Sequence, residues 1–265
     1  VHYDELLKDT TLGIYQVANT LAIDNSDNLY IGTYSGLKVY NINTGLGFHY
    51  FKGDSIYDIG DSYITALFID SYQNLWIGTK SGGLFLKNKN SKKINLISDK
   101  YKMISSITED SDGNIYFGGV SNHIHIYNPT KKSFSTIQFS KNKTTESPAY
   151  RGNIVNCDRY DNIWVGTEDE GLFKVNRSNS TSENYNTTNS ELKSNFITSI
   201  FCDKKGVTWI GTDKGGLTTI VNGEMVTNTH DKNKAFTIAC NTIYCFYMSR
   251  DENMWIGTFS GGVSI

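Results

Sequence analysis

The hydrophobic and polar positions of the chain follow one pattern that recurs along its length. A run of apolar, β-branched and aromatic residues ends in aspartate, as in YITALFID (63–70), and the polar turn SYQN (71–74) follows it. A second run, LWIGT (75–79), leads through a glycine turn into a third, LFLKN (84–88). Short apolar runs between turn signals are typical of antiparallel strands joined by hairpins. The pattern therefore predicts three strands in succession.

A weaker fourth strand is expected in each copy of the pattern. GFHYFKG (47–53) and KKSFSTIQF (131–139) keep enough apolar residues to form one, after a polar and variable stretch. The longest polar stretch, residues 176–195, is expected to be a mobile loop before the fifth copy. Each copy thus predicts a unit of four short strands.

The aromatic residue before the Ile-Gly, Phe-Gly or Val-Gly step marks six copies, with spacings of 46, 40, 48, 45 and 46 residues. These residues are Tyr30, Trp76, Tyr116, Trp164, Trp209 and Trp255. Four strands within about 45 residues are the signature of a β-propeller blade. We therefore predict an all-β chain, with a single β-propeller domain of six four-stranded blades over residues 1–265.

The two ends of the chain predict how the ring closes. Residues 1–24 parallel residues 47–70, so the chain begins at a fourth strand, and it stops at GGVSI (261–265) after a third strand. The N-terminal strand is expected to complete the last blade and remove its open edge. The alternative is that the six blades are part of a seven-bladed or larger ring.

Each residue of the repeated phrase has an expected structural role. Trp76 and Gly78 face the same side of their strand, so Trp76 is expected to fill the space between blades and Gly78 to let the next backbone come close. The glycines that follow supply the positive φ of the turn. The aspartates at the strand ends are expected to bond the amides of the next turn. They are Asp24, Asp70, Asp110, Asp158 and Asp203.

Composition and charge narrow the classes of partner. A net charge of −2 provides no excess of positive charge of the kind that binds the phosphates of nucleic acid. No run of 18 apolar residues is present, so a membrane anchor is expected only in segments outside this sequence. The four cysteines lack metal-site spacing and are expected to be free and mostly buried. No cofactor is expected.

Candidate chemistry is expected at the mouth of the channel. The turns after each second strand and the segments entering each first strand should share one face, where tyrosine, asparagine, arginine and carboxylates suit a polar small molecule or an oligosaccharide. The candidates are Tyr34, Tyr63, Lys80, Lys102, Asn122, Arg151, Glu168, Asn195, Asp213, Asn241 and Phe259. No catalytic or metal-binding residue is assigned, because TEDEG (167–171) lacks calcium-loop spacing and the pair His123 and His125 has no third ligand.

The motif D-x-x-x-N-L-W-I-G-T-x-x-G-G-L resembles the two-component regulator propeller repeat. The resemblance covers the whole chain, although the third copy has Gly119 for threonine and Asn122 for glycine. It implies the extracytoplasmic sensor region of a membrane-anchored signalling protein. In that family, histidine kinases are the best-known proteins with such regions, including hybrid kinases that sense glycans in gut bacteria, and diguanylate cyclases also carry them.

Three functions are therefore considered. The first is a periplasmic or cell-surface sensor domain that is not itself an enzyme and binds a polar ligand at the channel mouth. The second is a non-catalytic scaffold that docks a second copy of the chain or a partner receptor domain. The third is an enzyme of the propeller lyase or lactonase kind, which the lack of acidic residues recurring around the ring disfavours.

Overall fold

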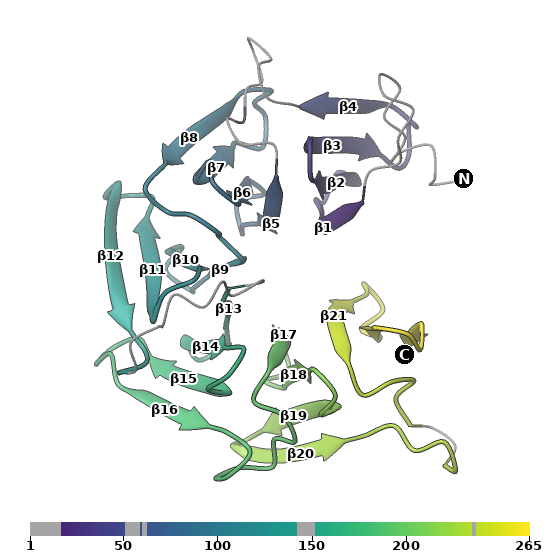
Figure 1. Cartoon of the computed structure of the whole chain (residues 1–265). Coiled ribbons are helices and arrows are strands. Elements are labelled where there is room, and N and C mark those ends of the chain that lie inside the picture. The colour runs from purple at the N-terminus through teal and green to yellow at the C-terminus, as the bar shows by residue number, and fades with distance from the viewer. Residues whose placement is uncertain (1–16, 51–58, 60–62, 142–151, 235–236) are drawn as a thin grey trace. The chain divides into compact units, whose positions relative to one another are not determined.

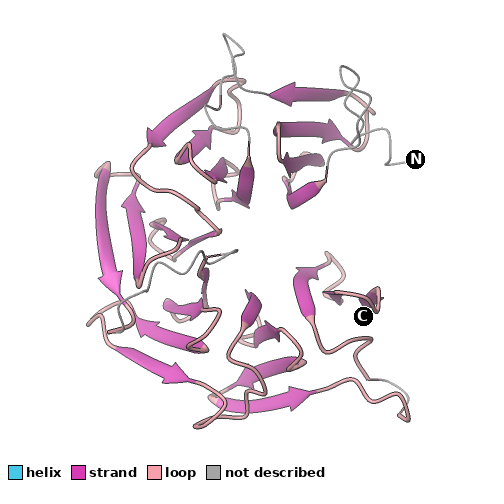
Figure 2. Ribbon diagram, viewed as in Figure 1, coloured by secondary structure: helices cyan, strands magenta, loops and turns pink. Residues whose placement is uncertain are grey.

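The computed structural model describes residues 17–50, 59, 63–141, 152–234 and 237–265. Figures 1 and 2 show that the regular elements of this part of the chain are β-strands. The described residues hold no helix that is long and apolar enough to cross a membrane. The chain divides into two compact units, residues 1–109 and 110–265.

The first unit contains two antiparallel sheets, each with its strands in sequence order, and the first strand of a third sheet. The first sheet consists of β1 (Ala18–Ile23), β2 (Asn28–Thr33), β3 (Gly36–Asn41) and β4 (Gly47–Tyr50). The second consists of β5 (Ile64–Ile69), β6 (Leu75–Thr79), β7 (Leu84–Lys87) and β8 (Ile94–Ser98). The third begins with β9 (Ser106–Glu109).

The second unit continues the same order. The third sheet goes on through β10 (Ile115–Gly118), β11 (His123–Asn128) and β12 (Ser133–Gln138). The fourth is β13 (Ile154–Cys157), β14 (Asn162–Gly166), β15 (Leu172–Asn176) and β16 (Ser182–Tyr185). The fifth is β17 (Ile197–Cys202), β18 (Thr208–Thr212), β19 (Leu217–Val221) and β20 (Glu224–Asn228). The sixth has β21 (Ile243–Met248), β22 (Met254–Thr258) and β23 (Val263–Ser264).

These sheets confirm the predicted all-β, six-blade organisation. Over the described ranges, each of the six sequence repeats forms one antiparallel sheet, five of them with four strands and the last with three. The stretch 176–195 is not the expected loop, because it contains β16, the fourth strand of its blade. The expected N-terminal closing strand lies in residues 1–16, outside the described residues.

The hydrophobic core lies between successive sheets. In the first unit Tyr30 and Leu37 of one blade cluster with Ile64 and Ile77 of the next. In the second unit a comparable layer joins each pair of neighbouring blades. Both faces of these strands are therefore covered, which explains why the second strands read as continuous apolar runs. LWIGT (75–79), for example, is buried at all five positions.

The aspartate at the end of the first strand in blades one to five bonds the following turn, as predicted, and also binds the aromatic residue of the second strand. Asp70 accepts hydrogen bonds from the amide of Asn74 at 2.7 Å and from the Asn74 carboxamide at 3.0 Å. The oxygen that accepts the carboxamide, Oδ2, also accepts the indole N–H of Trp76 at 2.9 Å. The same contacts recur around Asp158 in blade four. The expected positive φ occurs at the last turn glycine, for example Gly83 at 105°.

Gly78 makes room for a side chain rather than for the expected backbone. A methyl group placed on Gly78 would lie 2.5 Å from Cγ2 and 2.9 Å from Cβ of Ile104, which precedes the first strand of the next blade. Gly166 and Ile197 make the same contact in the second unit. The glycine therefore leaves room for the side chain of an isoleucine of the following blade. The predicted close approach is thus a contact between the isoleucine side chain and the glycine backbone.

We expect Gly78→Ala to lower the free energy of unfolding by about 2 kcal/mol, because the added methyl group overpacks against Ile104. Urea denaturation of the wild type, Gly78→Ala, Ile104→Ala and the double variant measures the cost. The double variant should lose less than the two single costs together, since Ile104→Ala removes Cγ2. If the losses of stability from the two single substitutions simply add in the double variant, the proposed packing of Ile104 against Gly78 is contradicted.

The four cysteines are free, as expected, but they are less buried than predicted. Cys157, Cys202 and Cys240 are partly exposed, and Cys245 is exposed. Cys157 and Cys202 sit next to the strand-end aspartates, where burial raises the pKa of both thiols. These two thiols stay protonated at neutral pH.

Candidate functional site

The turns after the second strands and the segments that enter the first strands lie side by side, as predicted. In the first unit the amide of Lys80 donates to the carbonyl of Tyr63 at 3.0 Å, and the amide of Met103 donates to the carbonyl of Lys80 at 2.7 Å. In the second unit the amide of Asp213 donates to the carbonyl of Phe196 at 2.9 Å. We call this side of each unit the glycine-turn face, because the turn glycines lie on it.

Three predicted site residues of the first unit form one group, which we call the tyrosine–lysine cluster. Tyr34 lies in the turn between β2 and β3, Tyr63 precedes β5, and Lys80 follows β6. The rings of Tyr34 and Tyr63 meet edge to face with their centroids 4.5 Å apart. The Lys80 ammonium lies 5.1 Å from the centroid of the Tyr63 ring. Tyr34 remains 51% exposed, so its ring is open to a ligand.

The electrostatics of this cluster favour hydrogen bonding by the neutral phenol of Tyr63 beside a cation. Burial, with a hydrogen bond between Tyr63 and Tyr34, raises the pKa of Tyr63, so its hydroxyl stays protonated at neutral pH. Lys102, also predicted, directs its ammonium to the carbonyl of Ser81 in the turn after β6. A neutral aromatic surface flanked by ammonium groups can bind a polar ligand through ring contacts and hydroxyl hydrogen bonds.

Sequence reasoning missed Met103, which lies between Lys102 and Ile104, the residue that packs against Gly78. Its φ is 52°, a left-handed conformation that is uncommon for a long side chain. Such backbone strain concentrates at ligand sites and is maintained by the surrounding structure. Here the bond from its amide to Lys80 holds it in place. The sequence carried no signal for it, since no glycine or asparagine marks the position.

The predicted asparagines of the second unit have structural partners. The Asn122 carboxamide donates to the carbonyl of Ser140 at 3.0 Å. Asn195 accepts the amide of Thr187 at 2.9 Å through its side chain, and Asn241 accepts the amide of His230 at 2.6 Å. The first bond lies within blade three, and the other two lie in the loops that connect blade four to blade five and blade five to blade six. A role of the three residues in binding stays a prediction.

The remaining predicted residues that the structure describes are spread over the glycine-turn face of the second unit. Asp213 accepts the hydroxyl of Thr242 at 3.0 Å. Phe259 is 66% exposed and meets Tyr244, which sequence reasoning did not select, with ring centroids 5.6 Å apart. Glu168 lies partly exposed after β14. Arg151 lies outside the described residues.

The two metal sites considered from the sequence, TEDEG (167–171) and the pair His123 and His125, do not bring a set of metal ligands together in the structure. In TEDEG (167–171) the carboxylate of Glu170 is occupied by the hydroxyl of Ser140, at 2.9 Å. His125 packs against the ring of Phe117, and burial lowers the pKa of its imidazole to about 4. Among the residues that the structure describes, no group of three or more histidine, cysteine, aspartate or glutamate side chains could hold a metal ion.

The comparison with protein families confirms the resemblance of the repeat. Residues 58–81, 191–214 and 237–260 match the family described as two component regulator propeller. These segments begin before a first strand and end just after a second strand, so they contain the strand-end aspartate or its replacement and the Trp-Ile-Gly-Thr step. No curated protein matches the chain.

Solved structures share the fold at low sequence identity. The extracellular domain of a hybrid two component system from B. thetaiotaomicron is 23% identical with a TM-score of 0.53, over 94% of this chain and 39% of that one. PorZ, a surface component of the type-IX secretion system of Porphyromonas gingivalis, is 18% identical with a TM-score of 0.71, over 98% of this chain and 40% of PorZ.

A third structure of the same fold is a catalytically inactive virginiamycin B lyase from Staphylococcus aureus. It is 14% identical with a TM-score of 0.69, over 94% of this chain and 83% of the lyase. The three likenesses support the β-propeller fold predicted from the repeat. The chain spans only about two fifths of the hybrid-system domain and of PorZ.

Proposed function

We propose that this chain, which carries two-component regulator propeller repeats, is the sensor propeller of a membrane-anchored bacterial signalling receptor. It acts on the extracytoplasmic side and passes ligand binding to an output domain, such as a histidine kinase, elsewhere in the receptor. The family match and the likeness to an extracellular domain of a hybrid two component system support this assignment.

The tyrosine–lysine cluster is the ligand-binding surface that we propose for this sensor. Its class of ligand is a polar small molecule or an oligosaccharide, because sugar rings stack on tyrosine and their hydroxyl groups bond phenols and ammonium groups. The observation that carries the proposal is the exposed ring of Tyr34 held edge to face against Tyr63 beside Lys80. The contact holds Tyr34 in one orientation and so lowers the entropy cost of binding.

The sensor is proposed to be non-catalytic. The likeness to a lyase, at 14% identity, concerns the fold, and many functions share one fold. In the described part of the glycine-turn face, the carboxylates of Glu170 and Asp213 are held by Ser140 and Thr242. Neither the contact of Glu170 with Ser140 nor that of Asp213 with Thr242 places a general acid opposite a general base across an open site.

A thermal-shift screen of the chain with neutral sugars, oligosaccharides, amino acids and Ca²⁺ tests the proposal. We expect one ligand class to raise the melting temperature in a saturable way, because binding to the folded state stabilises it. Tyr34→Ala should weaken the affinity for that class by about tenfold.

Tyr72→Ala is the matched control, since Tyr72 is a 76% exposed tyrosine of the same unit that lies in the turn after β5, away from the cluster. It should leave binding unchanged. If no class of ligand shifts the melting temperature, or if the two variants behave alike, the tyrosine–lysine cluster is not the sensing surface. A docking scaffold then becomes the better account.

A further inference from the structure

The segment that leads into blade six brings two glycine turns of the second unit together at Thr242. Its hydroxyl donates to Oδ1 of Asp213 at 3.0 Å and accepts the amide of Lys214 at 3.0 Å, both in the turn after β18. Its carbonyl accepts the amide of Phe259, in the turn after β22, at 3.0 Å. Thr242 is buried, so these bonds hold the two turns in a fixed relation on the glycine-turn face.

The aromatic pair of Tyr244 and Phe259 arises from a departure from the repeat. Each of β1, β5, β17 and β21 has a register shift, or β-bulge, at one residue. In the first three strands this residue is Asn19, Thr65 or Thr198, and it donates to the carbonyl of an isoleucine in the following blade. In β21 it is Tyr244, whose ring meets that of Phe259. Bulges redirect side chains, and this one redirects an aromatic ring.

This aromatic pair is open to a ligand and is held in place. Tyr244 is 38% exposed and Phe259 66% exposed, and their ring planes are inclined at 79°. The turn that carries Phe259 is closed by Thr258, whose hydroxyl donates to the carbonyl of Gly262 at 2.9 Å and accepts the amide of Gly261 at 3.1 Å. A preformed aromatic surface binds a further ring at a low entropy cost.

The turn after β18 supplies one charge of each sign next to Thr242. Asp213 uses Oδ1 for Thr242, and its Oδ2 has no hydrogen-bond partner among the described residues. Lys214 is exposed, and its ammonium forms no ion pair with a residue that the structure describes. Its φ of 60° is held by the bond from its amide to Thr242. A carboxylate and an ammonium on successive residues match the two charges of a zwitterion.

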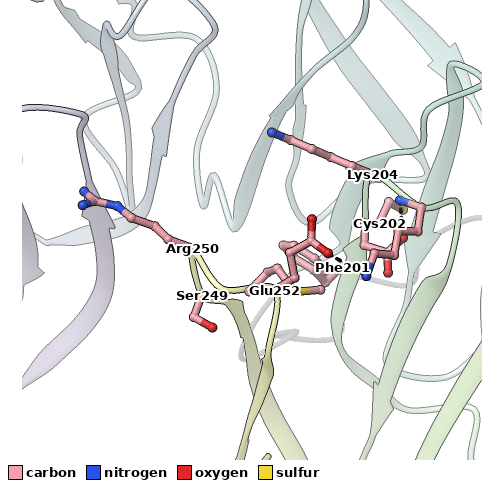
Figure 3. A pocket seen from close by; sticks show the side chains of 9 residues that line it. Phe201, Cys202, Lys204, Ser249, Arg250 and Glu252 are labelled. Atoms are coloured by element: carbon pink, nitrogen blue, oxygen red, sulfur yellow. Dashed lines mark hydrogen bonds and ion pairs between the residues drawn. The ribbon is translucent and has the colours of Figure 1, made fainter.

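The opposite ends of β17 and β21 are less suited to such a ligand. There the two strands lead into turns that line a hollow of about 520 Å³, whose side chains are drawn in Figure 3. In these turns Lys205 pairs with Glu252 at 2.7 Å, and Asp251 accepts the hydroxyl of Ser249. These charged groups are used within the protein, whereas those beside Thr242 remain for a ligand.

We propose that the residues around Thr242 bind a free amino acid with an aromatic side chain. The ring of the ligand contacts Tyr244 and Phe259, its ammonium bonds Oδ2 of Asp213, and its carboxylate pairs with Lys214. We call this surface the Thr242 site. It lies in the second unit, apart in sequence from the tyrosine–lysine cluster, and adds a second ligand class to the proposed sensor.

Calorimetric titration of the chain with L-phenylalanine and L-tryptophan tests the proposal. We expect one or both to bind saturably. Three probes each lack one group of the ligand: glycine lacks the ring, phenethylamine lacks the carboxylate, and 3-phenylpropionate lacks the ammonium. Each probe should bind at least about tenfold more weakly, because it loses either the ring contact or one charge-assisted hydrogen bond.

Two substitutions test the charged contacts one at a time. Asp213→Asn keeps an acceptor for Thr242 but removes the charge, so it should weaken binding of the amino acid by about tenfold and leave the affinity for 3-phenylpropionate unchanged. Lys214→Asn suits the left-handed backbone and should weaken binding of the amino acid but not of phenethylamine. A damaged fold would instead weaken the binding of every probe.

Phe259→Ala tests the aromatic contact and should weaken binding of the amino acid by about tenfold. Tyr160→Ala is the matched control, since Tyr160 is also 66% exposed and lies in the turn after β13 of the same unit. Tyr34→Ala, in the tyrosine–lysine cluster, should leave the affinity for the amino acid unchanged. Thermal melting of each variant checks that the fold is retained.

The proposal is overturned if neither amino acid binds, or if a probe that lacks one group binds as tightly as the whole ligand. Equal effects of Phe259→Ala and Tyr160→Ala would also overturn it, as would binding that is lost in Tyr34→Ala. Failure at the Thr242 site leaves the proposed sensing surface standing, because that surface is tested by Tyr34→Ala with its own ligand class. The two proposals can therefore fail separately.

Discussion

Asp70→Ala is expected to lower the free energy of unfolding by about 4 kcal/mol. Asp70 is 4% exposed and accepts the Trp76 indole N–H and two N–H groups of Asn74. Trp76 is 1% exposed, so its N–H finds no water when the carboxylate is removed. A buried donor left without a partner costs about 1–3 kcal/mol, and bonds to a charged acceptor are stronger than neutral ones.

Urea denaturation of wild type and variant measures this effect, with the emission of the tryptophans as the signal. Asp99→Ala is the matched control, because Asp99 is an exposed aspartate of the same unit, and its stability should stay close to that of the wild type. A cost for Asp70→Ala as small as that of the control would show that the acid and the indole contribute little to the blade.

Arg177→Ala is expected to cost about 3 kcal/mol, because it leaves a buried carboxylate without its cation. Arg177 follows β15 in blade four and binds Asp110, at the end of β9 in blade three, whose side chain is fully buried. The same guanidinium lies 2.8 Å from Asp112 and 3.6 Å from Asp161. Three carboxylates thus share one arginine, and its loss exposes each of them to the repulsion of the others.

The exposed ion pair between Lys193 and Glu191 is the control for this substitution. Its side chains are 57% and 64% exposed, so Lys193→Ala should change stability little. Equal effects of Arg177→Ala and Lys193→Ala on the urea midpoint would contradict the role of Arg177 between blades three and four.

The dependence of the Arg177 effect on pH follows from Asp110. Burial raises the pKa of Asp110, but hydrogen bonds from Asn114, Arg177 and Tyr116 outweigh it and leave the pKa below its ordinary value of 3.8. A depressed carboxyl pKa stabilises the fold above the pKa of the unfolded chain, and this stability is lost as the pH falls through the folded value. The difference between wild type and Arg177→Ala should therefore persist from pH 7 to about pH 4 and shrink below it.

The strands and turns of the fold follow closely from the sequence because they depend on local signals. LWIGT (75–79) is β6 residue for residue, and the turn glycines adopt the expected positive φ. These features depend only on the alternation of side chains along a strand and on the ability of glycine to adopt a positive φ. The strand β16 was missed because SENY (182–185) is polar, and it forms through its ladder with β15. Pairing with a formed edge outweighs weak local preference.

Contacts between blades could not be predicted, since they depend on how successive sheets pack. Gly78 was expected to face a backbone and instead meets Ile104, 26 residues later. Arg177 reaches Asp110 across 67 residues, a pairing that no local pattern indicates. The asparagines of the candidate site looked available as polar loop residues, but amides and carbonyls of nearby loops bond their carboxamides. Loop backbone groups without a partner in a strand ladder need other partners, and these side chains provide them.

The candidate site likewise combines features that could be predicted from the sequence with features that could not. The placement of both loop sets on one face followed from the blade topology, and the meeting of Tyr34 with Tyr63 followed from that placement. The left-handed conformation of Met103 did not, because no glycine or asparagine marks its position.

Hydrogen–deuterium exchange with and without the neutral ligand class selected by thermal shift tests the central claim most directly. Exchange slows where bound ligand excludes water and holds loop amides closed. We expect slower exchange at residues 34–36, 63, 80–83 and 102–104, which form the tyrosine–lysine cluster and its loops. Slower exchange confined to other segments, or none at all under saturating ligand, would contradict sensing at this surface.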